Sequence, residues 1–77
     1  MKFPIMRTDQ FLSLAYKDQL QLISHTGKLK NSFIENGYQF SLYKVKDFYV
    51  ELKRNIHELS FEKITALDYS DLPAQYK

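Results

Sequence analysis

The chain has 77 residues, with eleven basic and nine acidic side chains and a formal net charge of +2. A chain of this length forms a single domain, and the absence of cysteine excludes disulfide bonds and thiolate metal sites. The charge excess is also small for a protein that binds duplex DNA, because such binding depends on clustered basic residues that neutralise phosphates.

The first residues, 1–7, are predicted to form a loose lead-in, because Pro4 biases Phe3 towards extended geometry. They lack the apolar region of roughly 7–15 residues that a signal peptide needs. No run of the sequence approaches the ~20 apolar residues of a membrane span. We therefore expect a cytoplasmic protein that makes no membrane contact.

Residues 8–26 are predicted to be helical, with Thr8 or Asp9 at the N-cap. Gly27 suits the left-handed position that follows many helices. The apolar residues of this segment form two adjacent stripes, which should face the core. The stripes contain Phe11, Leu12, Leu14, Ala15, Tyr16, Leu20, Leu22 and Ile23.

The same segment also contains a second helix-start signal. Asp18 is followed three residues later by Gln21, which is the spacing of a capping box. One continuous helix and two short helices with a bend near Lys17 are both compatible with this pattern. We favour the bend.

Residues 28–67 are predicted to form a four-stranded antiparallel meander. Segment 38–52 holds five aromatic residues, two valines and two leucines, largely spaced in period two. Asn36-Gly37 is a strong signal for a type I′ hairpin turn, because both residues tolerate positive φ. We expect strands near residues 29–35, 38–43, 48–53 and 59–67, with turns at residues 44–47 and 54–58.

One face of this sheet should pack against the helical segment. The predicted inner residues are Tyr38, Phe40, Leu42, Phe48, Val50 and Leu52. In the last strand the apolar residues change parity, and a β-bulge near Glu62-Lys63 would restore them to the core side. Residues 68–77 contain Pro73 and are predicted to be an irregular tail, frayed at its end. The fold class is α+β, with the N-terminal helical segment on one face of the meander.

The run Leu42-Tyr43-Lys44-Val45, followed by residues 48–52 (FYVEL), resembles a group of short uncharacterised bacterial α+β proteins. The likeness covers residues 11–67 and describes a hairpin rather than a site. It implies a bacterial origin and supports the α+β fold. It brings no catalytic residue with it.

Residues that could carry chemistry are few. His25 and His57 are predicted to lie at a helix end and in a turn, without metal-ligand spacing to another histidine or a cysteine. The two glycines serve a cap and a turn, and no serine lies in a nucleophile motif. The sequence therefore predicts neither an enzyme nor a bound cofactor or metal.

The outer sheet face is the candidate interaction surface, formed by Tyr43, Tyr49, Lys44, Lys46, Lys53 and Arg54. Aromatic residues beside basic ones can stack on unpaired bases and hold phosphates. Glu51, predicted on the same face, opposes nucleic-acid binding. The alternatives are cross-strand aromatic packing and a subunit interface.

We therefore expect a small non-catalytic protein–protein interaction or adaptor module, with single-stranded nucleic-acid binding as the alternative. We also expect a homodimer, because six tyrosines and six phenylalanines exceed what one helix-covered sheet face can hide. The identity of a protein partner is not specified by the sequence.

Overall fold

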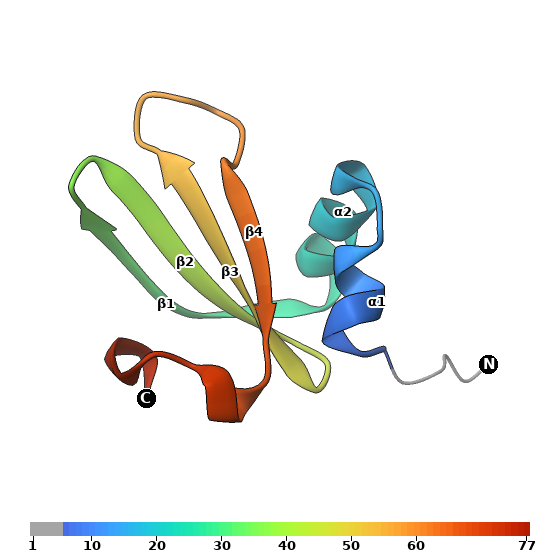
Figure 1. Cartoon of the computed structure of the whole chain (residues 1–77). Helices are drawn as coiled ribbons and strands as arrows, with labels where there is room; N and C mark the ends of the chain where they lie inside the picture. Colours follow the sequence, from blue (N-terminus) through green and yellow to red (C-terminus); the bar gives the residue numbers. More distant parts are fainter. Residues whose placement is uncertain (1–5) are drawn as a thin grey trace.

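The structure is a computed structural model that describes residues 6–77, so most of the predicted lead-in lies outside the described residues. Two helices precede an antiparallel sheet of order β1-β2-β3-β4 (Figure 1). The elements are α1 (Thr8–Leu12), α2 (Tyr16–Thr26), β1 (Gly27–Glu35), β2 (Tyr38–Val45), β3 (Phe48–Asn55), β4 (Lys63–Leu67), and the short 3-10 helices η1 (Tyr69–Asp71) and η2 (Ala74–Tyr76). The predicted α+β meander is confirmed.

The helical segment is divided in two, as favoured, and the break lies at residues 13–15 rather than near Lys17. A helix as short as α1 leaves carbonyl groups without intrahelical partners. The buried amide of Gln19 donates to the carbonyl of Phe11 at 3.1 Å, and this bond joins α2 to the end of α1. Gln19 is therefore a buried polar residue with a structural role.

Gly27 does not adopt the left-handed conformation that we predicted. Its φ of −78° and ψ of 145° are extended, and β1 begins at this residue without an intervening loop. A Cβ atom at position 27 would lie 2.6 Å from the carbonyl oxygen of Ile23. Glycine is needed here because the strand turns away so close to the last turn of α2.

The main core lies between the helices and the sheet. Its buried residues are Phe11, Ile23, Val45, Phe48, Val50 and Leu52. The rings of Phe11 and Phe48 lie 5.6 Å apart in a tilted arrangement, so α1 is held to β3 by an aromatic contact. Leu12 remains 46% exposed and does not face this core, contrary to prediction.

The predicted facing of β2 is wrong. Val45 pairs directly with Phe48, and residues directly opposite in an antiparallel pair point to the same face. Side chains alternate along a strand, so Tyr43 also lies on the helix side. Phe40 and Leu42 therefore point to the other side of the sheet, which we call the second face.

The second face is covered by the C-terminal segment, residues 68–77. This segment leaves β4 and turns back past β2 and β1, on the side away from α1 and α2 (Figure 1). Leu42 and Leu72 are both buried. The ring of Tyr76 lies 5.8 Å from that of Phe33, and its hydroxyl donates to Glu51 at 2.6 Å. The segment is irregular as predicted, but its end packs on the sheet instead of fraying.

The strand β4 is shorter than predicted, and its regular pairing with β3 ends at Lys53 and Lys63. The backbone N–H of Glu62 also donates to the carbonyl of Lys53 at 2.7 Å, so Glu62 and Lys63 both lie opposite one residue of β3, as in a β-bulge. Phe61, Ile64 and Ala66 pack against the core as predicted, whereas Leu59 lies in the β3–β4 loop and is 98% exposed. A second irregularity of the sheet lies in β1, between Leu29 and Asn31. The Asn36-Gly37 turn has φ values of 53° and 82°, as expected for type I′.

Replacing Phe11 with alanine should destabilise the protein by about 3–5 kcal/mol, because a fully buried aromatic ring and its contact with Phe48 are lost. Leu12→Ala, one residue further along α1, should change the free energy of unfolding by less than about 1 kcal/mol. Chemical denaturation of both variants measures the difference. Equal losses would contradict the assignment of the core face of α1.

Replacing Tyr76 with phenylalanine should lower stability by about 1 kcal/mol, because a hydrogen bond to a carboxylate is lost at a partly exposed site. Burial and the hydrogen bond to Glu51 raise the pKa of the Tyr76 phenol. Because this pKa is higher in the folded state than in the unfolded state, the protonated phenol stabilises the fold at pH values below the unfolded-state pKa. The contribution is lost as the pH rises through the folded-state pKa. As the pH rises above about 10, the stability of Tyr76→Phe should therefore fall less than that of the wild type. Denaturation at a series of alkaline pH values tests this, and identical slopes would contradict it.

Candidate functional site

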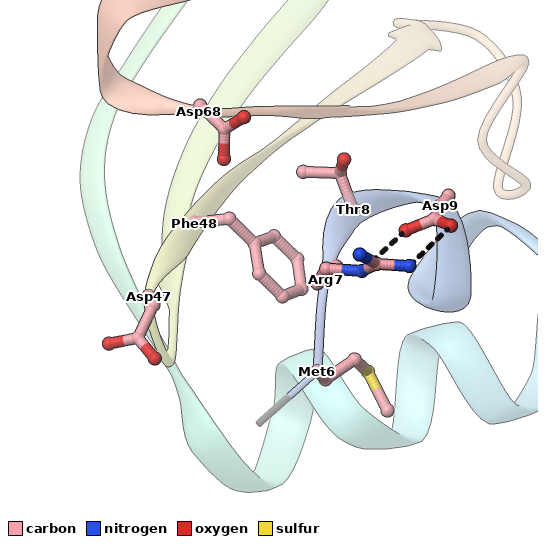
Figure 2. Close-up of a pocket in the computed structure, with 7 residues that line it drawn as sticks. All are labelled: Met6, Arg7, Thr8, Asp9, Asp47, Phe48 and Asp68. Atoms are coloured by element: carbon pink, nitrogen blue, oxygen red, sulfur yellow. Dashed lines mark hydrogen bonds and ion pairs between the residues drawn. The ribbon is translucent and has the colours of Figure 1, made fainter. Parts of the chain in front are cut away.

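One hollow lies beside the start of α1 and has a volume of about 430 Å³. It is lined by Met6, Arg7, Thr8, Asp9, Asp47, Phe48 and Asp68 (Figure 2). Figure 2 shows Arg7 turned towards Asp9, with which it forms a 3.5 Å ion pair, while Asp47 and Asp68 lie away from this pair and apart from each other. The carboxylates do not converge. Among residues 6–77, no group of histidine, cysteine, aspartate or glutamate side chains could hold a metal ion.

A second hollow, which we call the α2 groove, lies between α2 and the helix side of the sheet. Its volume is about 380 Å³, and its lining residues are Leu20, Ile23, Ser24, Gly27, Tyr43, Leu52 and Phe61. One wall comes from α2, the floor from β2 and β3, and the other wall from Phe61 in the β3–β4 loop. The hydroxyl of Tyr16 accepts a hydrogen bond from the Phe61 backbone N–H at 3.0 Å, which ties this wall to α2.

Apolar surface continues beyond the groove. Leu29 is the direct partner of Tyr43 across the β1–β2 pair, so it lies on the same face, and it is 57% exposed. Further along this face the side chains become polar. Arg54 donates to the carbonyl of Glu58 at 2.7 Å and to the side chain of Gln39, which donates to Ser32 at 3.3 Å. An apolar floor with a polar rim is the usual anatomy of a protein interface.

The sequence-predicted interaction surface does not form as a unit. Tyr43 lies on the helix side in the α2 groove, whereas Tyr49 lies on the second face. The two tyrosines therefore cannot form one stacking platform. Of the four basic residues, Lys44 and Lys53 lie on the second face, Arg54 lies on the helix side, and Lys46 lies in the β2–β3 turn.

The second face nevertheless carries a smaller basic surface. Lys28 and Lys44 are direct cross-strand partners, and with Lys46 and Thr26 they line a hollow of about 290 Å³. Tyr49 is the partner of Lys44 on β3, and its ring lies 6.1 Å from that of the 61% exposed Tyr69. Lys53 is engaged elsewhere, since its Nζ lies 4.3 Å from the centre of the Tyr38 ring.

The sequence pattern predicts Leu20 in the core and Phe61 in a strand, and it carries no signal that marks Leu29 as part of a surface. The apolar spacing of a helix shows which residues share a stripe, but not how far the sheet extends beneath that stripe. Both histidines are exposed, His25 in the last turn of α2 and His57 in the β3–β4 loop. They belong to separate elements, as the sequence predicts.

Neither helix of the described part of the chain is long and apolar enough to cross a membrane. A scan against protein-family models and searches of curated proteins and solved structures return no match to this chain.

Proposed function

We propose that this protein is a small non-catalytic interaction module that binds a protein partner in the α2 groove. The observation that carries the proposal is the difference between the two sides of the sheet. The apolar part of the second face is covered by the chain's own C-terminal segment, whereas the helix side leaves the groove and Leu29 open. Apolar surface that stays open beside a polar rim is typical of a docking site.

The lining of the groove favours binding over acid–base chemistry. Its polar side chains are the hydroxyls of Ser24 and Tyr43, and none of the lining residues is a carboxylate or a histidine. A volume of about 380 Å³ suits apolar side chains projecting from a partner segment, since pockets for ligands start near 300 Å³. The fitting partner is a peptide segment that presents aliphatic or aromatic side chains.

Leu20→Glu should weaken partner binding, because it places a carboxylate in the apolar wall of the groove. Lys17→Glu, on an exposed position of the same helix, is the matched control for the change towards negative charge. Proteins from source cells that the wild type retains are identified by mass spectrometry and purified. Each purified partner is then titrated against the wild type and both variants. We expect Leu20→Glu to weaken the dissociation constant by at least about tenfold, which is ~1.4 kcal/mol, and Lys17→Glu to leave it unchanged. A folded Leu20→Glu variant that binds as tightly as the wild type would contradict the proposal.

Single-stranded nucleic acid is the second candidate ligand, and the basic surface favours it. Like charges directly opposite across strands are destabilising, so a bound phosphate between Lys28 and Lys44 would relieve their repulsion. Tyr49 and the exposed Tyr69 supply rings on the same side for base stacking.

Fluorescence anisotropy with a labelled oligothymidine distinguishes the two functions. The affinity for the oligothymidine would fall steeply as the salt concentration rises. Lys28→Gln and Lys44→Gln would weaken this binding, but Leu20→Glu would not. Binding that does not depend on these lysines, or no binding at low salt, removes this candidate. The cytoplasmic location and the bacterial origin stay predictions from the sequence.

A further inference from the structure

The outer edge of β1 is open. β1 is the first strand of the sheet, has nine residues, and is paired on one side only, by β2. Seven of its nine residues are exposed, and only its first residue and Phe33 are partly buried. The opposite edge strand, β4, is five residues long and packs beside α1. An exposed edge strand presents unpaired backbone groups that can pair with another chain.

The two halves of this edge differ. The first half carries Lys28, Lys30 and the irregularity between Leu29 and Asn31, which are features that prevent strand pairing at an edge. The second half, residues 31–35, pairs one-to-one with β2 and ends at the type I′ turn. Ile34 in this half is 65% exposed. The edge is protected in its first half and open to pairing in its second.

The backbone groups that point outward can be assigned from the turn. The residues that flank a two-residue hairpin turn exchange backbone hydrogen bonds, and bonded pairs then alternate with non-bonded pairs along the ladder. Glu35 and Tyr38 flank this turn, so the backbone groups of Glu35 and Phe33 face β2. Those of Ile34 and Ser32 face the free edge.

We propose that β1 pairs antiparallel with β1 of a second copy of this chain, about a twofold axis at Phe33. This register overlaps the whole regular segment with itself, residues 31–35. Ile34 of each copy then lies opposite Ser32 of the other, so the outward backbone groups meet as hydrogen-bonded pairs. Phe33 lies opposite Phe33 of the second copy in a non-bonded pair, where side chains are closest. This extends the stacked Phe33–Phe40 pair, whose centroids are 5.2 Å apart, across the interface.

The charges along β1 favour the antiparallel arrangement. Lys28 and Lys30 lie at the first end of the strand and Glu35 lies at the last. Antiparallel pairing brings the basic end of each copy towards the acidic end of the other, whereas parallel pairing would bring like charges together. Twofold symmetry is also the commonest closed arrangement of identical chains.

The pairing goes beyond the proposed function and does not depend on it. The twofold axis is perpendicular to the sheet, so the helices of both copies lie on one side and the C-terminal segments on the other. The α2 groove remains open in each copy. If Leu20→Glu bound a protein partner as tightly as the wild type, the proposed pairing of β1 would still stand.

Cysteine cross-linking tests the register, because the chain has no cysteine of its own. Ser32→Cys and Ile34→Cys proteins are mixed and oxidised. Opposed residues in a bonded pair have Cα atoms about 5.5 Å apart, which a disulfide spans, while pairs offset by two residues lie beyond its reach of roughly 7 Å. We expect a disulfide-linked dimer in the mixture and little in either variant alone or with Lys17→Cys on α2. The proposed register would be wrong if either variant cross-linked as much alone, or with Lys17→Cys, as in the mixture. It would also be wrong if the mixture did not cross-link.

Sedimentation equilibrium tests the interface itself. The wild-type mass should rise with protein concentration from 9.2 kDa towards twice that value. Ile34→Lys should hold it at the monomer value, because an edge lysine opposes pairing. Leu59→Lys is the matched control, an exposed aliphatic residue in the β3–β4 loop, and should dimerise like the wild type. A wild-type mass of 9.2 kDa even at millimolar protein, or a folded Ile34→Lys variant that still dimerises, would overturn the inference.

Discussion

The pairing of Val45 with Phe48 across the β2–β3 turn decides which side of the sheet each large side chain occupies. It sends Tyr43 and Val50 to the helix side and Leu42 to the second face. Both faces are therefore apolar, and a sheet with two apolar faces needs a cover on each side. The helices supply one cover and the C-terminal segment supplies the other.

The helix cover depends on tertiary contacts rather than on helix propensity. α1 has five residues, and an isolated helix shorter than about 12–15 residues is marginal in water. Phe11 anchors it to Phe48, and Gln19 supplies a partner for the Phe11 carbonyl. These two interactions place a short helix beside β4 and leave α2 to reach over β1 and β2. The α2 groove is open because the two helices do not cover the full width and length of the sheet.

Some of this architecture can be predicted from single residues. Asn36-Gly37 identifies its hairpin because few other dipeptides tolerate two positive φ values, and Phe48, Val50 and Leu52 do face the helices. The side of Leu42 could not be predicted in the same way. Leu42 and Tyr43 are adjacent apolar residues, and a strand that is covered on both faces loses the alternation that reveals its orientation.

The packing of the C-terminal segment was equally hard to predict, since short 3-10 helices have no long hydrophobic period and Pro73 indicates irregular structure. The candidate surface was mispredicted for the same reason as Leu42. An error of one residue in facing separates Tyr43 from Tyr49 and moves the site to the other side of the sheet.

Gly27 connects two regions that would otherwise be independent. It lines the α2 groove and is also the first residue of β1, with no loop to absorb movement between helix and strand. A ligand that displaced α2 would therefore also alter the start of the edge strand. Any coupling between groove occupancy and edge pairing would be reciprocal, because each binding event would change the free energy of the other by the same amount. The missing loop therefore ties the position of the last turn of α2 directly to that of the first residues of β1.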